Sequence, residues 1–203
     1  MSFLALLSLL LMALPTTPAG QRYLLYLHPR IVEDQGRLPT DPAFGVYQFD
    51  AILDSLRQRG FTVLSDQRGP KASSDSAATR VTQQVDSLLR LGISPEAISV
   101  VGFSKGGWIA ILASTRLRNP AVRFVFLGAC GPWSNDPTDL HVAGHLLSLY
   151  EKSDSLGVSC APLLGRRGAG SDAEEIELDL GLEHGTFFQP RAAWLDPVTA
   201  WIR

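Results

Sequence analysis

The sequence predicts an α/β protein, built as a three-layer α/β/α sandwich around a mostly parallel sheet. Short apolar segments rich in β-branched and aromatic residues alternate with amphipathic segments at helical spacing, an order typical of parallel strands covered on both faces. The connections between these segments are short, so we expect no second domain. The chain has 203 residues, of which 45% are apolar, and this is enough for one sizeable core.

The predicted strands are short apolar runs whose continuous hydrophobicity indicates burial on both faces of the sheet. In chain order they are YLLYLH at 23–28, FTVLS at 61–65, AISVVG at 97–102, VRFVFL at 122–127, LLSLY at 146–150 and the segment 176–182.

The predicted helices have apolar residues three and four positions apart, which places these residues on one face. In chain order they are 46–59, 76–91, 105–117 and 190–202. Gly60 and Gly92 follow the first two helices, and Pro120 follows the third, as residues that end helices commonly do.

The N-terminal segment differs from the rest because residues 1–20 contain no Asp, Glu, Lys or Arg. Its apolar run, FLALLSLLLMAL, is about twelve residues long, whereas a membrane-spanning helix needs roughly 20. The small residues PTTPAG follow this run and suit signal peptidase. We therefore expect a signal peptide at 1–20 and an exported domain at 21–203, periplasmic or secreted, with no stable membrane anchor after cleavage. The alternative is a buried N-terminal core helix.

Charge argues against one class of partner. The formal net charge is −2, and no block of five like charges occurs, so the sequence lacks the basic footprint of a nucleic-acid-binding protein. We expect no nucleic-acid partner.

The strongest motif is Gly102-Phe103-Ser104-Lys105-Gly106, which matches G-x-S-x-G and joins a predicted strand to a predicted helix. Such a tight turn holds the serine in a strained conformation and exposes its hydroxyl at the carboxyl edge of the sheet. The N–H of Lys105 then lies at a helix N-terminus, where developing negative charge is stabilised. The motif predicts that Ser104 is a nucleophile; the alternative is a glycine-rich packing turn.

A serine nucleophile needs a base, and the base needs an acid that orients it. Of the four histidines, only His184 follows the last predicted strand, where a base reaches the elbow; otherwise it is a surface-loop histidine. Asp154 follows the strand 146–150 and is the favoured acid, although it would also suit a helix N-cap. The other aspartates considered are Asp136 and Asp139, which follow the preceding strand, and Asp172 and Asp179, which are poorly placed.

The elbow VVGFSKGG, the segments YEKSDSLGVSC and LGLEHG, and the strand order together resemble the α/β-hydrolase fold over residues 23–203, in a minimal form like that of small bacterial members. The resemblance implies ester-type hydrolysis by a serine nucleophile, without metal or organic cofactor, and it implies no particular substrate. We expect a small-molecule acyl substrate, cleaved by Ser104, Asp154 and His184. The loop 131–141 occupies the position at which larger members insert a lid. Because this loop is short, we expect no lid domain and an open, shallow pocket.

One loop departs from the family pattern. Where members have a His-Gly motif, this chain has His28-Pro29-Arg30, and proline has no N–H to offer an oxyanion. We therefore expect Arg30, or Ile31, to supply the second oxyanion donor beside Lys105.

Other side chains near these motifs carry weaker expectations. His28 and Phe103 are expected at the substrate, although a histidine at this place more often braces its loop, and Phe103, which flanks the elbow, also suits the core or the pocket wall. Arg30, Glu33 and Asp34 line the pocket mouth or belong to a solvated loop with a surface ion pair of little energetic worth.

The two cysteines, Cys130 and Cys160, follow neighbouring predicted strands. In an exported protein they are expected to form a disulfide; the alternative is two buried thiols. Two rival functions remain at this point. The first is a non-catalytic binding protein on the same scaffold, which Pro29 favours, and the second is an intracellular thioesterase, which requires a structural N-terminus.

Overall fold

The computed structural model describes residues 20–131 and 140–203. The predicted signal peptide, apart from Gly20, lies outside the described residues, as do Asp136, Asp139 and most of the loop at the expected lid position. In the part of the chain that is described, no helix is long and apolar enough to cross a membrane.

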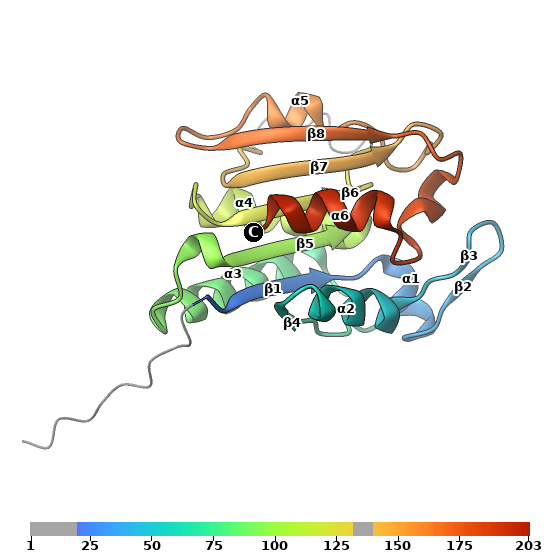
Figure 1. Cartoon of the computed structure of the whole chain (residues 1–203), viewed down its shortest axis with the longest axis horizontal. Helices are drawn as coiled ribbons and strands as arrows, with labels where there is room; N and C mark the ends of the chain where they lie inside the picture. The colour runs from blue at the N-terminus through green and yellow to red at the C-terminus, as the bar shows by residue number, and fades with distance from the viewer. Residues whose placement is uncertain (1–19, 132–139) are drawn as a thin grey trace, which may run out of the picture.

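A six-stranded sheet forms the centre of the molecule, in the order β4-β1-β5-β6-β7-β8 (Figure 1). Its strands are β1 (Arg22–Leu27), β4 (Phe61–Leu64), β5 (Ile98–Phe103), β6 (Arg123–Leu127), β7 (His145–Glu151) and β8 (Asp172–Leu178). All neighbouring pairs are parallel, so the carboxyl ends of the strands share one edge, at the right of Figure 1. This is the edge at which open parallel sheets bind ligands.

Helices cover both faces of the sheet, as the sequence predicts. Helices α2 (Phe49–Gln58) and α6 (Ala192–Trp201) lie on one face, and α3 (Ser74–Arg90) and α4 (Lys105–Leu117) lie on the other (Figure 1). Alternation along β1 links the two layers. Leu24 and Tyr26 pack in the core beneath α2 and α6, while Leu25 and Leu27 pack beneath α3 and α4. The three-layer sandwich is therefore confirmed.

Most predicted elements begin and end within three residues of the observed ones, and the exception is β8. It runs Asp172–Leu178, four residues before the predicted strand, with the sequence DAEEIEL. Within the described part of the chain, this strand pairs only with β7 and lies at the edge of the sheet, where charged side chains reach water and discourage further pairing. A search for apolar runs passes over such a strand.

Several short elements were not predicted. They are α1 (Arg30–Gln35), the hairpin of β2 (Thr40–Asp41) and β3 (Gly45–Val46), the turn η1 (Pro95–Ala97), α5 (Ala161–Leu164) and the turn η3 (Glu183–Phe187). Each is too short for a periodic pattern to reveal, because one or two turns give no repeat. Two of them, α1 and η3, lie beside the candidate site.

The structure joins Cys130 and Cys160 in a disulfide, with Cα atoms 5.3 Å apart. Cys130 follows β6, and Cys160 lies just before α5, in the segment that follows β7. The N–H of Val158 also donates to the carbonyl oxygen of Cys130 at 2.8 Å. The disulfide therefore fixes the segment that carries Asp154 to the end of the neighbouring strand.

Candidate active site

Ser104 occupies a sharp turn between β5 and α4. Its backbone angles are φ 54° and ψ −119°, a conformation that costs a non-glycine residue about 1–3 kcal/mol. The turn closes only because two neighbours lack side chains. A Cβ on Gly102 would lie 2.2 Å from the carbonyl oxygen of Gly106, and a Cβ on Gly106 would lie 1.9 Å from that of Leu27. The G-x-S-x-G motif therefore has the geometry of a nucleophile elbow.

Asp154 and His184 form a buried pair. Oδ2 of Asp154 accepts a hydrogen bond from Nδ1 of His184 at 2.6 Å, and the two side chains are 1% and 9% exposed. Oδ1 accepts from the N–H of Leu156 at 2.8 Å, so both carboxylate oxygens have partners. With the proton on Nδ1, Nε2 of His184 is left as the acceptor, which is the tautomer a general base requires.

The end of β6 contacts both Ser104 and His184. The N–H of Ser104 donates to the carbonyl oxygen of Leu127 at 2.9 Å. The next residue, Gly128, lies under the imidazole, where a Cβ would be 3.4 Å from Cε1 of His184. The Phe103 ring also lies 4.7 Å, centroid to centroid, from the imidazole. Ser104 and the Asp154–His184 pair therefore lie on the same carboxyl edge of the sheet, while none of the hydrogen bonds found among residues 20–131 and 140–203 joins Ser104 to His184.

The described alternatives to Asp154 have other partners. Asp172 pairs with His145 at 2.7 Å, and Asp179 pairs with Lys152 at 2.8 Å. All four side chains belong to the β7–β8 edge of the sheet, and neither aspartate contacts His184. Among the described aspartates, only Asp154 contacts the proposed base.

Glu151, at the end of β7, is a site residue that sequence reasoning missed. It is completely buried and accepts hydrogen bonds from the N–H groups of Leu180 and Gly181 and from the Thr186 hydroxyl, at 3.1–3.2 Å. These donors flank His184, so Glu151 holds the loop that presents the imidazole. The available signal was a carboxylate at the end of a strand that is otherwise buried.

A hollow of about 250 Å³ opens beside the loop that carries His184. Phe44, Glu183, Gly185 and Arg191 are among the residues that line it. Phe44 connects this hollow to the candidate site, because its ring lies 6.3 Å from the His184 ring.

Comparison with solved structures places this arrangement in a known fold, although no family model and no curated protein matches the sequence. The Francisella virulence factor BioJ aligns with a TM-score of 0.64 and 14% identity, over 91% of this chain and 77% of BioJ. An arylesterase aligns with a TM-score of 0.58 and 13% identity, over 90% and 75% of the two chains. A protein from Agrobacterium tumefaciens described as an α/β hydrolase aligns with a TM-score of 0.56 and 18% identity, over 89% and 81%.

This chain has the α/β-hydrolase fold. Identities of 13–18% show the architecture alone, so the chemistry of the site has to be argued from its own residues.

In this α/β-hydrolase fold the two expected oxyanion donors begin two helices. Lys105 is the first residue of α4, and Arg30 is the first residue of α1, directly after Pro29. Neither backbone N–H has a hydrogen-bond partner within residues 20–131 and 140–203. Both are therefore free to bind an oxygen.

A buried ion cluster joins these two helix starts. Oε1 of Glu33 accepts from Nε of Arg68 at 2.7 Å, and Oε2 accepts from Nζ of Lys105 at 2.5 Å. Nζ of Lys105 also donates to the carbonyl oxygen of Ala72 at 2.7 Å. The expectation that Glu33 lies at the pocket mouth or in a solvated loop is wrong, because its side chain is completely buried on α1. Arg30 does form the expected exposed surface pair, at 3.2 Å from Asp34.

The expectation that His28 and Phe103 contact substrate is corrected by their burial. Both are 0% exposed. Nε2 of His28 accepts from the N–H of Arg68, and Nδ1 donates to the Pro29 carbonyl oxygen, each at 2.8 Å. His28 therefore braces its loop, and Phe103 packs behind the His184 imidazole.

His28 is expected to make the stability of the protein dependent on pH. Burial, and next the charge of Arg68, lower its pKa from 6.5 to about 4. The folded state holds His28 neutral, so stability is complete above pH 6.5 and falls as the unfolded state takes up a proton between pH 6.5 and 4. As the pH falls from 6.5 to 4, we expect His28 to lower the free energy of unfolding by about 3 kcal/mol. Urea unfolding at a series of pH values measures it. The same slope in a His28→Gln variant would contradict the assignment.

Proposed function

We propose that this protein is a serine hydrolase that cleaves ester-type acyl bonds through a covalent acyl-enzyme. The observation that carries the proposal is the strained Ser104 turn, positioned at the carboxyl edge of the sheet together with the buried Asp154–His184 pair. A serine at its ordinary pKa is a weak nucleophile, and an oriented imidazole is the usual group that activates it.

In the proposed reaction, Nε2 of His184 takes the proton of Ser104 as Oγ attacks the acyl carbonyl carbon. Asp154 holds the imidazole in the required tautomer and stabilises the imidazolium that forms. The imidazolium then protonates the leaving alcohol, and the acyl group remains on Ser104. Water, deprotonated by His184, attacks the acyl-enzyme and releases the carboxylic acid.

The oxyanion of each tetrahedral intermediate is proposed to lie between the N–H groups of Lys105 and Arg30. Backbone donors of this kind contribute about 3–4 kcal/mol each when they are preorganised. The Glu33 cluster supports this role, because it fixes the Lys105 side chain away from the oxyanion and holds α1 against α4. Pro29 therefore has no N–H to offer the oxyanion, but the N–H of the next residue, Arg30, remains as a donor.

Covalent labelling tests the nucleophile. Incubation with phenylmethylsulfonyl fluoride is expected to add one sulfonyl group at Ser104, located by peptide mass spectrometry, and to stop turnover of p-nitrophenyl acetate. A Ser87→Ala variant, altered at an exposed serine of α3, is expected to label and turn over normally. Absence of both the adduct and turnover would favour a non-catalytic binding protein on this scaffold, the rival that Pro29 suggests.

Export is part of the proposal. The Cys130–Cys160 disulfide supports it, because structural disulfides persist mainly in oxidising compartments. N-terminal sequencing of the protein recovered outside the bacterial cytoplasm is expected to begin near Gln21. An intact N-terminus on active cytoplasmic protein would instead favour the intracellular thioesterase.

A further inference from the structure

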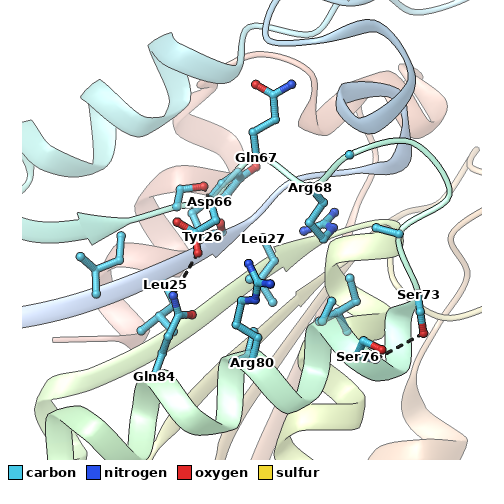
Figure 2. A pocket seen from close by; sticks show the side chains of 17 residues that line it. Leu25, Tyr26, Leu27, Asp66, Gln67, Arg68, Ser73, Ser76, Arg80 and Gln84 are labelled. Carbon is cyan, nitrogen blue, oxygen red and sulfur yellow. Dashed lines mark hydrogen bonds between the residues drawn. The ribbon is translucent and has the colours of Figure 1, made fainter.

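A second cavity, of about 340 Å³, lies between α3 and the loop that follows β4 (Figure 2). Its floor is formed by buried core residues, and its accessible apolar surface comes from Leu64, Ala72 and Ala77. Ser104, Asp154 and His184 do not line it, and the Glu33 ion cluster stands beside it, with Arg68 common to both. Its volume falls in the range of small-molecule sites, and it is a separate place from the candidate active site.

Two guanidinium groups reach into this cavity. Figure 2 shows Arg80 extending from α3 and Arg68 extending from the opposite loop towards the same space. Arg80 has no hydrogen-bond or ion-pair partner among the residues that the structure describes. Arg68 uses Nε for Glu33 and Nη2 for the His28 carbonyl oxygen, which leaves Nη1 without a protein partner in the same residues. The cavity therefore offers two donors to an incoming anion.

The charges around the cavity favour such an anion. Cations outnumber carboxylates among the lining residues, because Arg68 and Arg80 are accompanied there by a single carboxylate, Asp66. The adjoining ion cluster adds Lys105 and Glu33. Glu33 is already shared by two cations, and Asp66, at the exposed rim, accepts from the Gln84 amide at 3.2 Å. Burial lowers the pKa of Arg68, so a further negative charge nearby would stabilise its charged form.

We propose that this cavity binds a carboxylate that carries a short unbranched apolar chain. The carboxylate lies between Arg80 and Nη1 of Arg68, which together provide charge-assisted hydrogen bonds. The chain lies against Leu64, which is 36% exposed, and against the half-buried Ala72 and Ala77, whose apolar surface would otherwise remain in contact with water. Both parts of the ligand are required, because the two guanidinium groups bind the carboxylate and the apolar lining of the cavity binds the chain. This site does not depend on the proposed hydrolase activity.

Calorimetric titration of the full chain with octanoate tests the site. We expect saturable binding at one site, and at least tenfold weaker binding in Arg80→Gln, because one charge-assisted contact is lost. Arg90→Gln is the matched control. Arg90 is an exposed arginine on the same helix, and it does not line the cavity. The affinity of this variant for octanoate should therefore equal that of the parent chain. Ala77→Leu, which fills the cavity from α3, should also weaken binding.

Two comparison ligands separate the contributions of the charge and the chain to binding. Octan-1-ol lacks the charge, and inorganic phosphate lacks the chain. Each is expected to bind at least tenfold more weakly than octanoate. Amide NMR shifts on octanoate addition should centre on 65–69 and 72–84. Shifts centred on Ser104 and His184, phosphate binding equal to octanoate binding, or an affinity that Arg80→Gln leaves unchanged would each overturn the proposal.

Discussion

Replacing Ser104 with alanine is expected to lower kcat/KM for a short-chain ester by about 10⁴-fold or more. The substitution removes the attacking oxygen, while the oxyanion donors and the binding surface remain and account for any residual rate. Alanine meets the same backbone strain at φ 54°, so the free energy of unfolding should change little. Initial rates with p-nitrophenyl acetate measure the effect, and urea unfolding verifies the fold.

Companion variants separate the roles within the site. Asp154→Asn preserves the shape of the side chain but removes the charge that orients His184, and it should cost about 10⁴-fold. In the Ser104→Ala background, His184→Ala should cost almost nothing further, because the two groups act as a unit. Turnover by Ser104→Ala close to that of the parent chain would refute the assigned nucleophile.

Replacing Glu33 with alanine is expected to lower the free energy of unfolding by about 3–5 kcal/mol. The substitution leaves the largely buried Arg68 and Lys105 without their common carboxylate, and an uncompensated buried charge is costly. Urea unfolding monitored by tryptophan fluorescence measures the change.

Asp34→Ala provides the control for this variant. Asp34 neighbours Glu33 on α1 but pairs with Arg30 at the exposed surface, with side chains 74% and 43% exposed for Arg30 and Asp34. The loss should be below about 1 kcal/mol. An equal decrease in the free energy of unfolding in the two variants would show that the buried Glu33 cluster stabilises the protein no more than the exposed Arg30–Asp34 pair does.

Local patterns predicted the parts of the site that depend on neighbouring residues. The elbow needs glycine two positions before and after Ser104, and this spacing is visible in the sequence whatever surrounds it. The order of strands and helices likewise indicated which residues end strands, and this placed Asp154 and His184 at one edge.

The functions of isolated charged residues could not be predicted in this way. Glu33 binds Arg68 and Lys105, which lie 35 and 72 positions away, and nothing in the segment RIVEDQ distinguishes it from the exposed Asp34. The substrate contact expected of His28 was wrong for the same reason, and the alternative, that His28 braces its loop, is confirmed. Its burial depends on Arg68, whose loop closes over it only in the folded chain.

The sequence by itself determined the α/β/α architecture and the elbow, because hydrophobic periodicity and glycine spacing are local properties of the chain. Tertiary structure alone decided which charges are buried, how Glu33 binds Arg68 and Lys105, how Glu151 holds the loop that carries His184, and where the second cavity lies. These features arise from contacts between distant segments, and the free energy of a charged side chain depends on the partners that folding brings to it.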